Sequence, residues 1–451
     1  MTQHAKIAET FQADRDMAAW HDKTLWMVRE KRDRMSHEVP EWERLRDMAS
    51  DIKLYSNSHL DELLPRFEEN ARRNGAIVHW AKDAEEYCAI VAGILEDHHV
   101  KHFIKSKSML AEECGLAPFL EARGIDVVES DLGERILQLM HKRPSHIVLP
   151  AIHVRKEAVG ELFVREMGTE PGNNDQTYLT HAARRAMRHL FLEAEAAMTG
   201  ANFAVAETGE CVVCTNEGNA DLGTSMPKLQ ITAFGMDKIV PTRRSLGVFT
   251  RLLARSGTGQ PVTTYTAHYR SPRPGGEFHI IIVDNGRSEL VGNAAHRRVL
   301  NCLRCGACMN TCPVYRRSGG YSYTYFIPGP IGINLGMLAD PRRYHDNVSA
   351  CSLCYSCQYV CPAKVDLADQ IYLWRQDLKR YHVASASKHA MSLGMKWLMS
   401  RPAIFNAALR FAPLTNHLPR PLVYNRLNAW GLHHEMPHFE APHKPKAHEQ
   451  Q

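Results

Sequence analysis

The sequence predicts an α/β domain with a mixed, mostly parallel sheet, followed by a smaller all-helical domain. Two observations lead to this fold class. From Gly75 onward, short apolar runs that suit buried strands alternate with amphipathic stretches of helical length, a pattern typical of right-handed βαβ units. Between Cys302 and Cys361, one cysteine motif occurs twice within sequence of helical character. The expected parts of the chain are residues 1–72, 73–292, 293–380 and 381–451.

The first part, residues 1–72, is expected to be a helical arm. It is rich in Glu, Arg, Asp, Met and Ala, and no glycine precedes Gly75. Trp20, Leu25 and Val28 lie near helical spacing, which indicates an arm that packs on the rest of the protein. Its sequence shows no pattern of reactive residues.

The second part is the α/β domain, which should end near Leu290. Strands are expected over residues 76–80, 101–104, 124–128 and 146–149, with helices over 83–98, 110–122 and 132–141 between them. Further strands are expected over 202–206, 210–215, 262–269 and 278–283. These later strands are joined partly without helices, so the sheet should be mixed.

In open α/β sheets, ligands bind beyond the carboxyl ends of the strands. Loops expected there carry the residues that we take as a candidate substrate or anion site: Lys105, Lys107, Asn216 and Gly218. For each loop alone, an ordinary tight turn is the commoner explanation. The chain lacks a Walker motif at Ser256–Gly259 and a G-x-G-x-x-G after the first strand, which argues against a nucleotide site.

The cysteine motif is C-x2-C-x2-C-x3-C-P. The first run holds Cys302, Cys305, Cys308 and Cys312, and the second holds Cys351, Cys354, Cys357 and Cys361. A cubane [4Fe-4S] cluster needs four thiolates, and in two-cluster ferredoxins the fourth cysteine of each run ligates the other cluster. We therefore expect Cys302, Cys305, Cys308 and Cys361 on the first cluster, and Cys351, Cys354, Cys357 and Cys312 on the second.

Other roles for the cysteines are weaker. Zinc ribbons use two C-x2-C pairs and have no need of a third cysteine at the same interval. A disulfide framework is unsuited to a large chain without a signal peptide, which we expect to be cytoplasmic. The isolated cysteines Cys88, Cys114, Cys211 and Cys214 are expected to be core residues, since one C-x2-C pair in a strand makes no cluster.

Composition argues against several classes of protein. The net charge of +5 is not gathered into one basic block, so nucleic acid is not an expected partner. The sequence has no apolar run of membrane-spanning length.

After the second run, Leu367, Ile371, Trp374 and Leu378 form a helical stripe, which favours an α-helical ferredoxin. The extension beyond residue 381 is expected to hold a helix pair over 389–411, packed on its own domain or in peripheral contact with a membrane or partner.

Several motifs together resemble one known family. They occur in order from about residue 75 to 380: Lys105–Met109, Asp131–Glu134, Pro144–Val148, Pro150–His153, Gly200–Phe203, Thr215–Asn219, Val283–Ser288, Cys302–Cys308 and Tyr325–Gly332. They look like those of the lactate-utilisation iron-sulfur protein B family (LutB and YkgF type). The chain departs from that family at Tyr355-Ser356 and Gln358-Tyr359, between the cysteines of the second run.

The resemblance implies a lactate-utilisation domain of the sugar-isomerase and CoA-transferase-like kind, then a dicluster ferredoxin domain and a family-specific extension. It also implies a system that oxidises L-lactate to pyruvate. The expected partners are a cysteine-rich subunit similar to heterodisulfide reductase and a second protein with a lactate-utilisation domain.

We expect this chain to be an NAD-independent oxidoreductase subunit that relays single electrons through two [4Fe-4S] clusters. No residue is an evident proton or hydride abstractor, so the catalytic residues are unknown and the carbon chemistry is expected on a partner or at an interface. Two alternatives are open. The α/β domain itself could bind and oxidise a hydroxy acid or another small carboxylate, or the chain could be a redox-sensing and partner-docking module.

Overall fold

The computed structural model describes residues 2–381, 383, 386–424, 435 and 437–440. They fall into two compact units, Met1–Asp377 and Leu378–Gln451. The second unit contains α20 (Ala386–Met399), α21 (Pro402–Phe411) and the short α22 (Arg420–Val423). No helix among the described residues is long and apolar enough to cross a membrane.

The first unit is built around a six-stranded, wholly parallel sheet with the order β1-β10-β7-β4-β2-β3. Its strands are β1 (Ile77–Ala81), β2 (His102–Lys105), β3 (Asp126–Glu129), β4 (Ala196–Gly200), β7 (Leu229–Gly235) and β10 (Glu277–Val283). A second sheet has the order β8-β5-β6-β9 and contains both parallel and antiparallel pairs. Its strands are β5 (Phe203–Val205), β6 (Glu210–Thr215), β8 (Ile239–Val240) and β9 (Tyr265–Tyr269). The expected α/β class with a mostly parallel, mixed strand arrangement is confirmed.

Helices cover both faces of the large sheet, as parallel sheets require. On one face, Ile281 and Val283 pack against α5 (Ala84–Asp97), α6 (Met109–Cys114) and α7 (Leu116–Glu121). On the other face, Phe278, Ile280 and Ile282 pack against α4 (Leu60–Arg73). The single helix expected over residues 110–122 is two helices, because Gly115 adopts φ 68° and ends the first of them.

The expected strand over residues 146–149 is wrong. These residues lie in the loop between α8 (Leu132–Leu139) and α9 (Lys156–Met167). The Nδ1 atom of His146 accepts hydrogen bonds from the backbone N–H groups of Val148 and Leu149, each at 3.0 Å. The segment therefore folds back on its own side chain and cannot pair with a neighbouring strand.

The remaining helices of the α/β domain are α10 (Gln176–Glu193), α11 (Asn219–Ser225), α12 (Arg243–Gly257) and α13 (Arg287–Val291). Between Gly292 and Asp377 the structure has helices and no strand: α14 (Ala307–Thr311), α15 (Pro313–Ser318), α16 (Gly329–Ala339), α17 (Pro341–Tyr344), α18 (Ser356–Tyr359) and α19 (Leu367–Asp377). This second domain is all-helical, as expected. Leu367, Ile371 and Trp374 form the buried face of α19.

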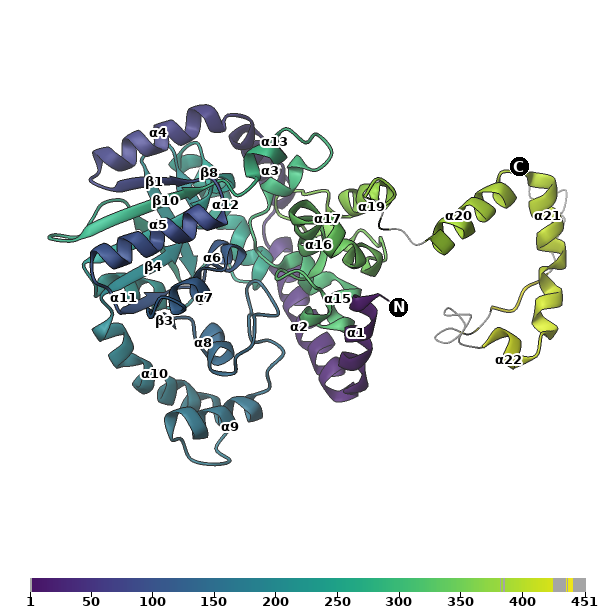
Figure 1. The fold of residues 1–451 in the computed structure, drawn as a ribbon, viewed down its shortest axis with the longest axis horizontal. Helices are drawn as coiled ribbons and strands as arrows, with labels where there is room; N and C mark the ends of the chain where they lie inside the picture. Colours follow the sequence, from purple (N-terminus) through teal and green to yellow (C-terminus); the bar gives the residue numbers. More distant parts are fainter. Residues whose placement is uncertain (1, 382, 384–385, 425–434, 436, 441–451) are drawn as a thin grey trace. The chain divides into compact units, whose positions relative to one another are not determined.

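The N-terminal arm consists of α1 (Gln3–Ala13), α2 (Arg15–His37) and α3 (Trp42–Ser58), followed by α4 on the sheet. Helix α2 packs against α14 and α15 of the helical domain and against α12 of the α/β domain. Helix α1 packs against α15, and the two lie side by side in Figure 1. The arm thus joins both domains and holds the helical domain against the α/β domain.

Candidate functional site

The two cysteine runs have the same backbone conformation. In the first run, Arg304 and Gly306 have positive φ angles of 59° and 76°; in the second, Leu353 and Tyr355 have 54° and 62° at the corresponding positions. Left-handed residues turn an extended chain sharply, so each run curls into a loop. In both loops, the N–H two residues after the first cysteine donates to that cysteine's sulfur, at 3.4 Å in the first run and 3.3 Å in the second.

The fourth cysteine of each run lies beside the other run. Cys302, Cys305, Cys308 and Cys361 line one small cavity, which Pro362, Val365 and Ile331 help to close. Burial and the thiolates of Cys361 and Cys302 raise the pKa of Cys305 to about 12. Burial raises the pKa of Cys312 to about 11, and its influential thiol neighbours are Cys351 and Cys354 of the second run.

These thiols fit two cubane clusters. All eight are free in the structure, and the two sets each offer four soft sulfur ligands, the donors that iron–sulfur clusters require. A buried thiol with a raised pKa keeps its proton until a metal displaces it. Among the eight, Cys354 is exposed, whereas Cys308 and Cys357 are buried. The second set therefore reaches solvent.

Two buried arginines of the arm bind the backbone around Cys361. The Nε atom of Arg46 donates to the carbonyl of Cys361 at 2.9 Å, and its Nη2 atom donates to that of Tyr359 at 2.8 Å. Arg32 donates to the carbonyl of Val360 at 3.1 Å. Both residues are at most 6% exposed. This role could not be predicted from the sequence, because Arg46 and Cys361 lie 315 residues apart.

The basic residues beside the cysteine runs are mostly paired with carboxylates of the arm. Arg316 and Arg317 bind Asp22 at 3.0 and 3.2 Å, and Lys364 binds Asp47 and, at 3.6 Å, Glu43. These ion pairs fasten the arm to the helical domain.

The first cysteine loop packs closely on the α/β domain. A Cβ atom at Gly306 would lie 2.8 Å from the imidazole of His146, and one at Gly257, the last residue of α12, would lie 2.9 Å from the carbonyl oxygen of Cys305. Asn310 bridges the same elements, 3.0 Å from Nε2 of His146 and 3.1 Å from the carbonyl of Gly257. Both glycines are therefore required for this contact.

Acidification should weaken this interface. Burial lowers the pKa of His146 to about 3 and that of His153, which lies 2.9 Å from the hydroxyl of Tyr321, to about 4. Imidazoles in the unfolded chain titrate near pH 6.5, so below that pH the unfolded state binds more protons. Stability is then lost as the pH falls from 6.5 towards 4, by about 2 kcal/mol per histidine at pH 5.

The measurement is the urea midpoint of the intact protein between pH 7 and pH 5. His153→Gln should have a flatter pH dependence than the wild type, whereas the same change at the exposed His181 should leave the dependence unaltered. Equal pH dependence in all three proteins would contradict the assignment.

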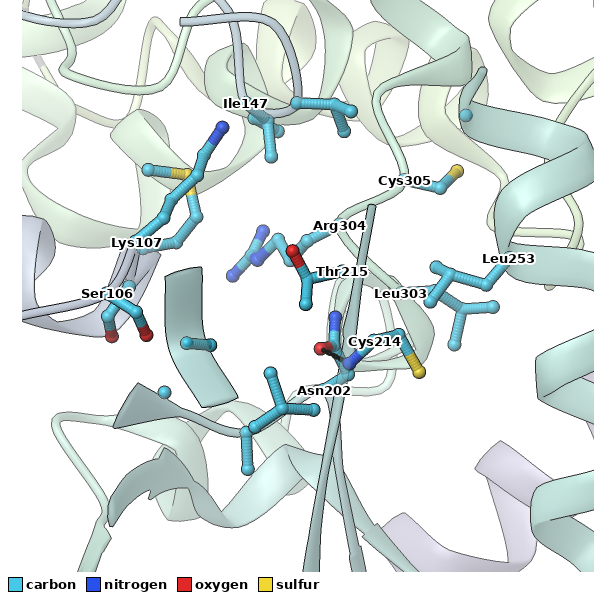
Figure 2. A pocket seen from close by; sticks show the side chains of 18 of the residues that line it. Ser106, Lys107, Ile147, Asn202, Cys214, Thr215, Leu253, Leu303, Arg304 and Cys305 are labelled. Carbon is cyan, nitrogen blue, oxygen red and sulfur yellow. Dashed lines mark hydrogen bonds between the residues drawn. The ribbon is translucent and has the colours of Figure 1, made fainter. Parts of the chain in front are cut away.

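A cavity of about 280 Å³ lies where the carboxyl ends of the parallel strands meet the first cysteine loop. Figure 2 shows Ser106 and Lys107 after β2, Cys214 and Thr215 in β6, and Arg304 and Cys305 of the helical domain around it. Asn216 also lines it. Two of the four residues expected in a substrate or anion site, Lys107 and Asn216, are thus at one cavity.

Lys105 and Gly218 are not among the residues that line this cavity. Lys105 is fully buried, and its Nζ atom lies 2.7 Å from Glu129 and 3.6 Å from Glu112. These two carboxylates hold its side chain away from the cavity. Gly218 precedes α11 and lies against the Tyr265 ring, 3.4 Å from its hydroxyl if a Cβ is added.

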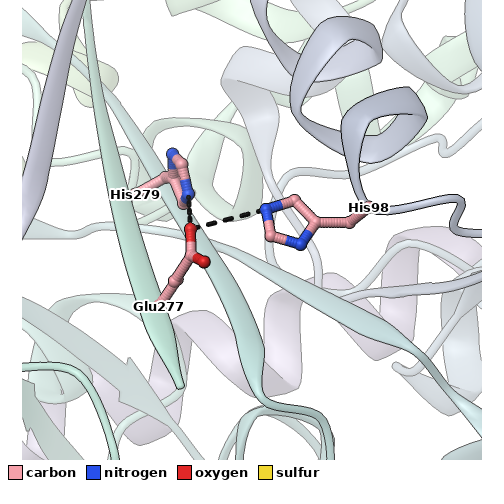
Figure 3. A group of neighbouring side chains, drawn as sticks. All are labelled: His98, Glu277 and His279. Carbon is pink, nitrogen blue, oxygen red and sulfur yellow. Dashed lines mark hydrogen bonds and ion pairs between the residues drawn. The ribbon is translucent and has the colours of Figure 1, made fainter. Parts of the chain in front are cut away.

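A separate group of side chains lies at the amino end of β10, the edge of the sheet opposite the cavity. His98 and His279 share one oxygen of Glu277, at 3.4 and 3.2 Å (Figure 3). The other ring nitrogen of His279 lies 3.0 Å from Nε2 of His79. This chain of hydrogen bonds accounts for the grouping. Glu277 and His279 are two residues apart in β10, but His98 follows α5, so spacing along the sequence could not reveal the group.

Comparison with known proteins agrees with this architecture. Residues 64–290 match the model of the LUD domain, and residues 298–365 match that of the 4Fe-4S dicluster domain. The chain is 40% identical over 385 residues to lactate utilization protein B of Geobacillus thermodenitrificans, covering 83% of this chain and 80% of that protein.

Two further relatives are similar over still more of the chain. Lactate utilization protein B of Bacillus pumilus is 40% identical over 396 residues, which are 85% of this chain and 83% of that protein. The uncharacterized electron transport protein YkgF of Escherichia coli is 36% identical over 418 residues, 90% of this chain and 88% of that protein. A solved structure of a DUF162 family protein from Deinococcus radiodurans aligns with 50% of this chain and 98% of that protein's chain. The sequence identity is 16% and the TM-score is 0.29.

The resemblance drawn from the sequence motifs is confirmed, as are the fold class and the two [4Fe-4S] clusters as cofactors. The protein is an iron–sulfur protein with a role in lactate utilisation. This chain belongs to the lactate utilization protein B family.

Proposed function

We propose that this chain is the electron-transfer subunit of a multi-protein, NAD-independent system that oxidises L-lactate to pyruvate. The observation that carries the proposal is the interleaving of the two cysteine runs. Cys302, Cys305, Cys308 and Cys361 hold one cluster, and Cys351, Cys354, Cys357 and Cys312 hold the other. The two cysteine sets lie near each other, since the Cys357 thiolate of the second set contributes to the raised pKa of Cys308 in the first. Neighbouring sites suit transfer between clusters.

The positions of the two cysteine sets support one direction for the proposed relay. When bound, each cluster accepts and donates one electron at a time, whereas the oxidation of lactate to pyruvate releases two electrons and two protons. The first set of cysteines lies against the α/β domain, with Cys305 on the wall of the cavity. The second set includes the exposed Cys354. Electrons would enter on the side of the α/β domain and leave where Cys354 meets solvent.

The partners that we propose are a cysteine-rich subunit similar to heterodisulfide reductase and a second protein with a lactate-utilisation domain. Exposed aromatic side chains beside the second run support a docking role for this part of the surface. Tyr355 is 44% exposed and Tyr359 is 71% exposed. Aromatic side chains are enriched at protein interfaces, where they bury a large area.

The test starts from anaerobically purified protein, in which iron and acid-labile sulfide are counted. About eight iron atoms per chain are expected for two cubanes. EPR then follows reduction on addition of L-lactate, with and without the two candidate partners. Reduction that requires the partners supports the relay. Reduction by L-lactate in the isolated chain would transfer the carbon chemistry to this protein, and no reduction in the complete mixture would reject the proposed function.

The alternative in which the α/β domain itself binds a small carboxylate is favoured by one observation, the cavity beside the first cluster loop. The second alternative, a redox-sensing module, gains no support from the described residues.

A further inference from the structure

The cavity is formed jointly by the two domains. The α/β domain provides the loop after β2, the residues after β4 and the end of β6, with Ser106, Asn202 and Thr215 on the wall. The helical domain provides Leu303, Arg304 and Cys305. In open α/β folds this edge of a parallel sheet is the usual place for a ligand. Here a ligand at that edge would also contact the loop that carries three cysteines of the first cluster.

Two of the four cations on the wall are already neutralised. Arg287 binds Glu113 at 2.9 Å and Asp237 at 2.7 Å, and Lys238 binds Asp237 at 2.8 Å. Burial alone would raise the pKa of Asp237, but Lys238 and Arg287 outweigh burial and hold it well below its usual range. This network supports the floor of the cavity and has little charge left for a ligand.

Arg304, unlike Arg287 and Lys238, is not neutralised by a carboxylate. Its Nη1 atom is buried, and its guanidinium has no hydrogen-bond or ion-pair partner within the described part of the chain. Figure 2 shows the side chain reaching into the cavity, between the sides that carry Lys107 and Thr215. A guanidinium that is partly removed from water without a partner costs free energy, so this position favours an anion. A planar carboxylate matches its two parallel N–H groups.

The opposite wall adds a second cation. Lys107 lines the cavity, and no ion pair ties it to any described residue. Two carboxyl groups also face this space. Asp131 accepts the N–H of Glu134 at 2.9 Å and so caps α8, and burial raises the pKa of Glu217. Arg304 and Lys107 are therefore the two cations on the wall without an ion-pair partner among the described residues.

The rest of the wall fits a small molecule with a hydroxyl or oxo group and a short carbon chain. Ser106 and Thr215 present hydroxyl groups, while Ile147, Leu253 and Leu303 make an apolar side. Mixed walls of this kind, with a few polar groups placed among apolar ones, are characteristic of small-molecule sites.

We propose that this cavity binds a small 2-hydroxy or 2-oxo carboxylate, whose carboxylate pairs with Arg304. The identity of the ligand rests on the proposed function; the anion site itself rests on the cavity and its unpaired cations. Arg304 lies directly before Cys305 and two residues after Cys302. Binding of an anion cancels a positive charge beside the first cluster, so occupancy should shift the reduction potential of that cluster to lower values.

The experiment uses the full chain with both clusters, prepared anaerobically and kept oxidised. Calorimetry measures the binding of L-lactate and pyruvate, with acetate and inorganic phosphate as probes of a general anion site. An EPR-monitored redox titration with and without pyruvate measures the potential of each cluster. Arg304→Gln should weaken pyruvate binding by about ten- to hundredfold, as expected for loss of a charge-assisted pair, and should abolish the shift in potential.

The matched control is Arg298→Gln, which removes the same charge from an exposed arginine that does not line the cavity and should leave binding unchanged. Iron content shows whether Arg304→Gln keeps both clusters. Lys107→Gln changes the cavity from the other domain and should weaken binding without loss of iron.

Unchanged affinity in both cavity variants, or no binding by fully loaded wild-type protein, would overturn the inference. Equal affinity for acetate, phosphate and pyruvate would overturn the ligand class. Failure of the proposed function is distinguishable, because pyruvate would still bind the cavity while L-lactate and the partners left the clusters oxidised.

Discussion

Replacing Cys312 with alanine should remove the cluster that the second cysteine run holds and leave the cluster of its own run intact. Cys312 has Cys351 and Cys354 as thiol neighbours, whereas Cys361 lines the cavity of Cys302 and Cys305. A cubane that loses one of four thiolates loses much of its stability. The iron content should therefore fall from about eight to about four atoms per chain.

Double variants make this result decisive. Cys312→Ala combined with Cys354→Ala removes two ligands from one cluster, so about four iron atoms should remain. Cys312→Ala combined with Cys305→Ala removes one ligand from each cluster, so almost none should remain. If each run instead held its own cluster, the two double variants would give the reverse result.

Cys114→Ala is the control for this series, because Cys114 lies at the end of α6 in the α/β domain and belongs to neither cysteine set. Its iron content should equal that of the wild type. Iron and acid-labile sulfide are measured after the same anaerobic reconstitution for every variant, so that differences reflect ligands and not loading.

The helices and strands with a clear local hydrophobic pattern could be predicted from the sequence. Strands β1, β2 and β6 and helix α5 lie within a residue or two of their expected bounds. The buried strands β4 and β7, with the sequences AAMTG and LQITAFG, were not predicted. AAMTG lacks the alternation that marks a half-buried strand. LQITAFG does alternate apolar and polar residues at first, but all seven of its residues are buried, because both faces of the sheet are covered. Only the completed sheet order shows that they are its centre.

The same distinction applies to the site. The eight cysteines follow from spacing, since each run forms one continuous loop. The cavity does not, because Lys107, Thr215 and Arg304 come from three segments that only the tertiary fold brings together. The arm is the clearest case: its composition suggested no function, yet Arg32 and Arg46 bind the backbone around Cys361.

Replacing Lys105 with methionine should strongly destabilise the α/β domain. Lys105 is fully buried between Glu129, at 2.7 Å, and Glu112, at 3.6 Å, and the nearly buried Glu134 lies in the same electrostatic group. Removal of one partner from a buried ion pair leaves an uncompensated charge and costs about 3–5 kcal/mol. That is a large part of the total free energy of unfolding of a typical domain, which is about 5–15 kcal/mol.

The loss should grow with pH. Burial raises the pKa of Glu112 and, together with the charge of Glu129, that of Glu134, and Lys105 opposes both shifts. Without the lysine, these two carboxyl groups retain protons in the folded state at a pH at which the unfolded chain has released them. The folded state then binds more protons, so the stability of the variant falls as the pH rises. The measurement is hydrogen exchange of the amides of β2 and β3, together with the urea midpoint, at pH 6 and pH 8.

Lys107→Met is the matched control, since it changes the same residue type two positions along the chain. Lys107 lines the cavity and forms no ion pair with the described residues, so its loss should reduce ligand affinity with little effect on exchange in β2 and β3. Lys105→Met combined with Glu129→Gln should recover part of the stability, because the unpaired charge is removed. If Lys105→Met instead reduced ligand affinity and left stability unchanged, Lys105 would be the anion-binding residue and the buried ion pair would contribute little.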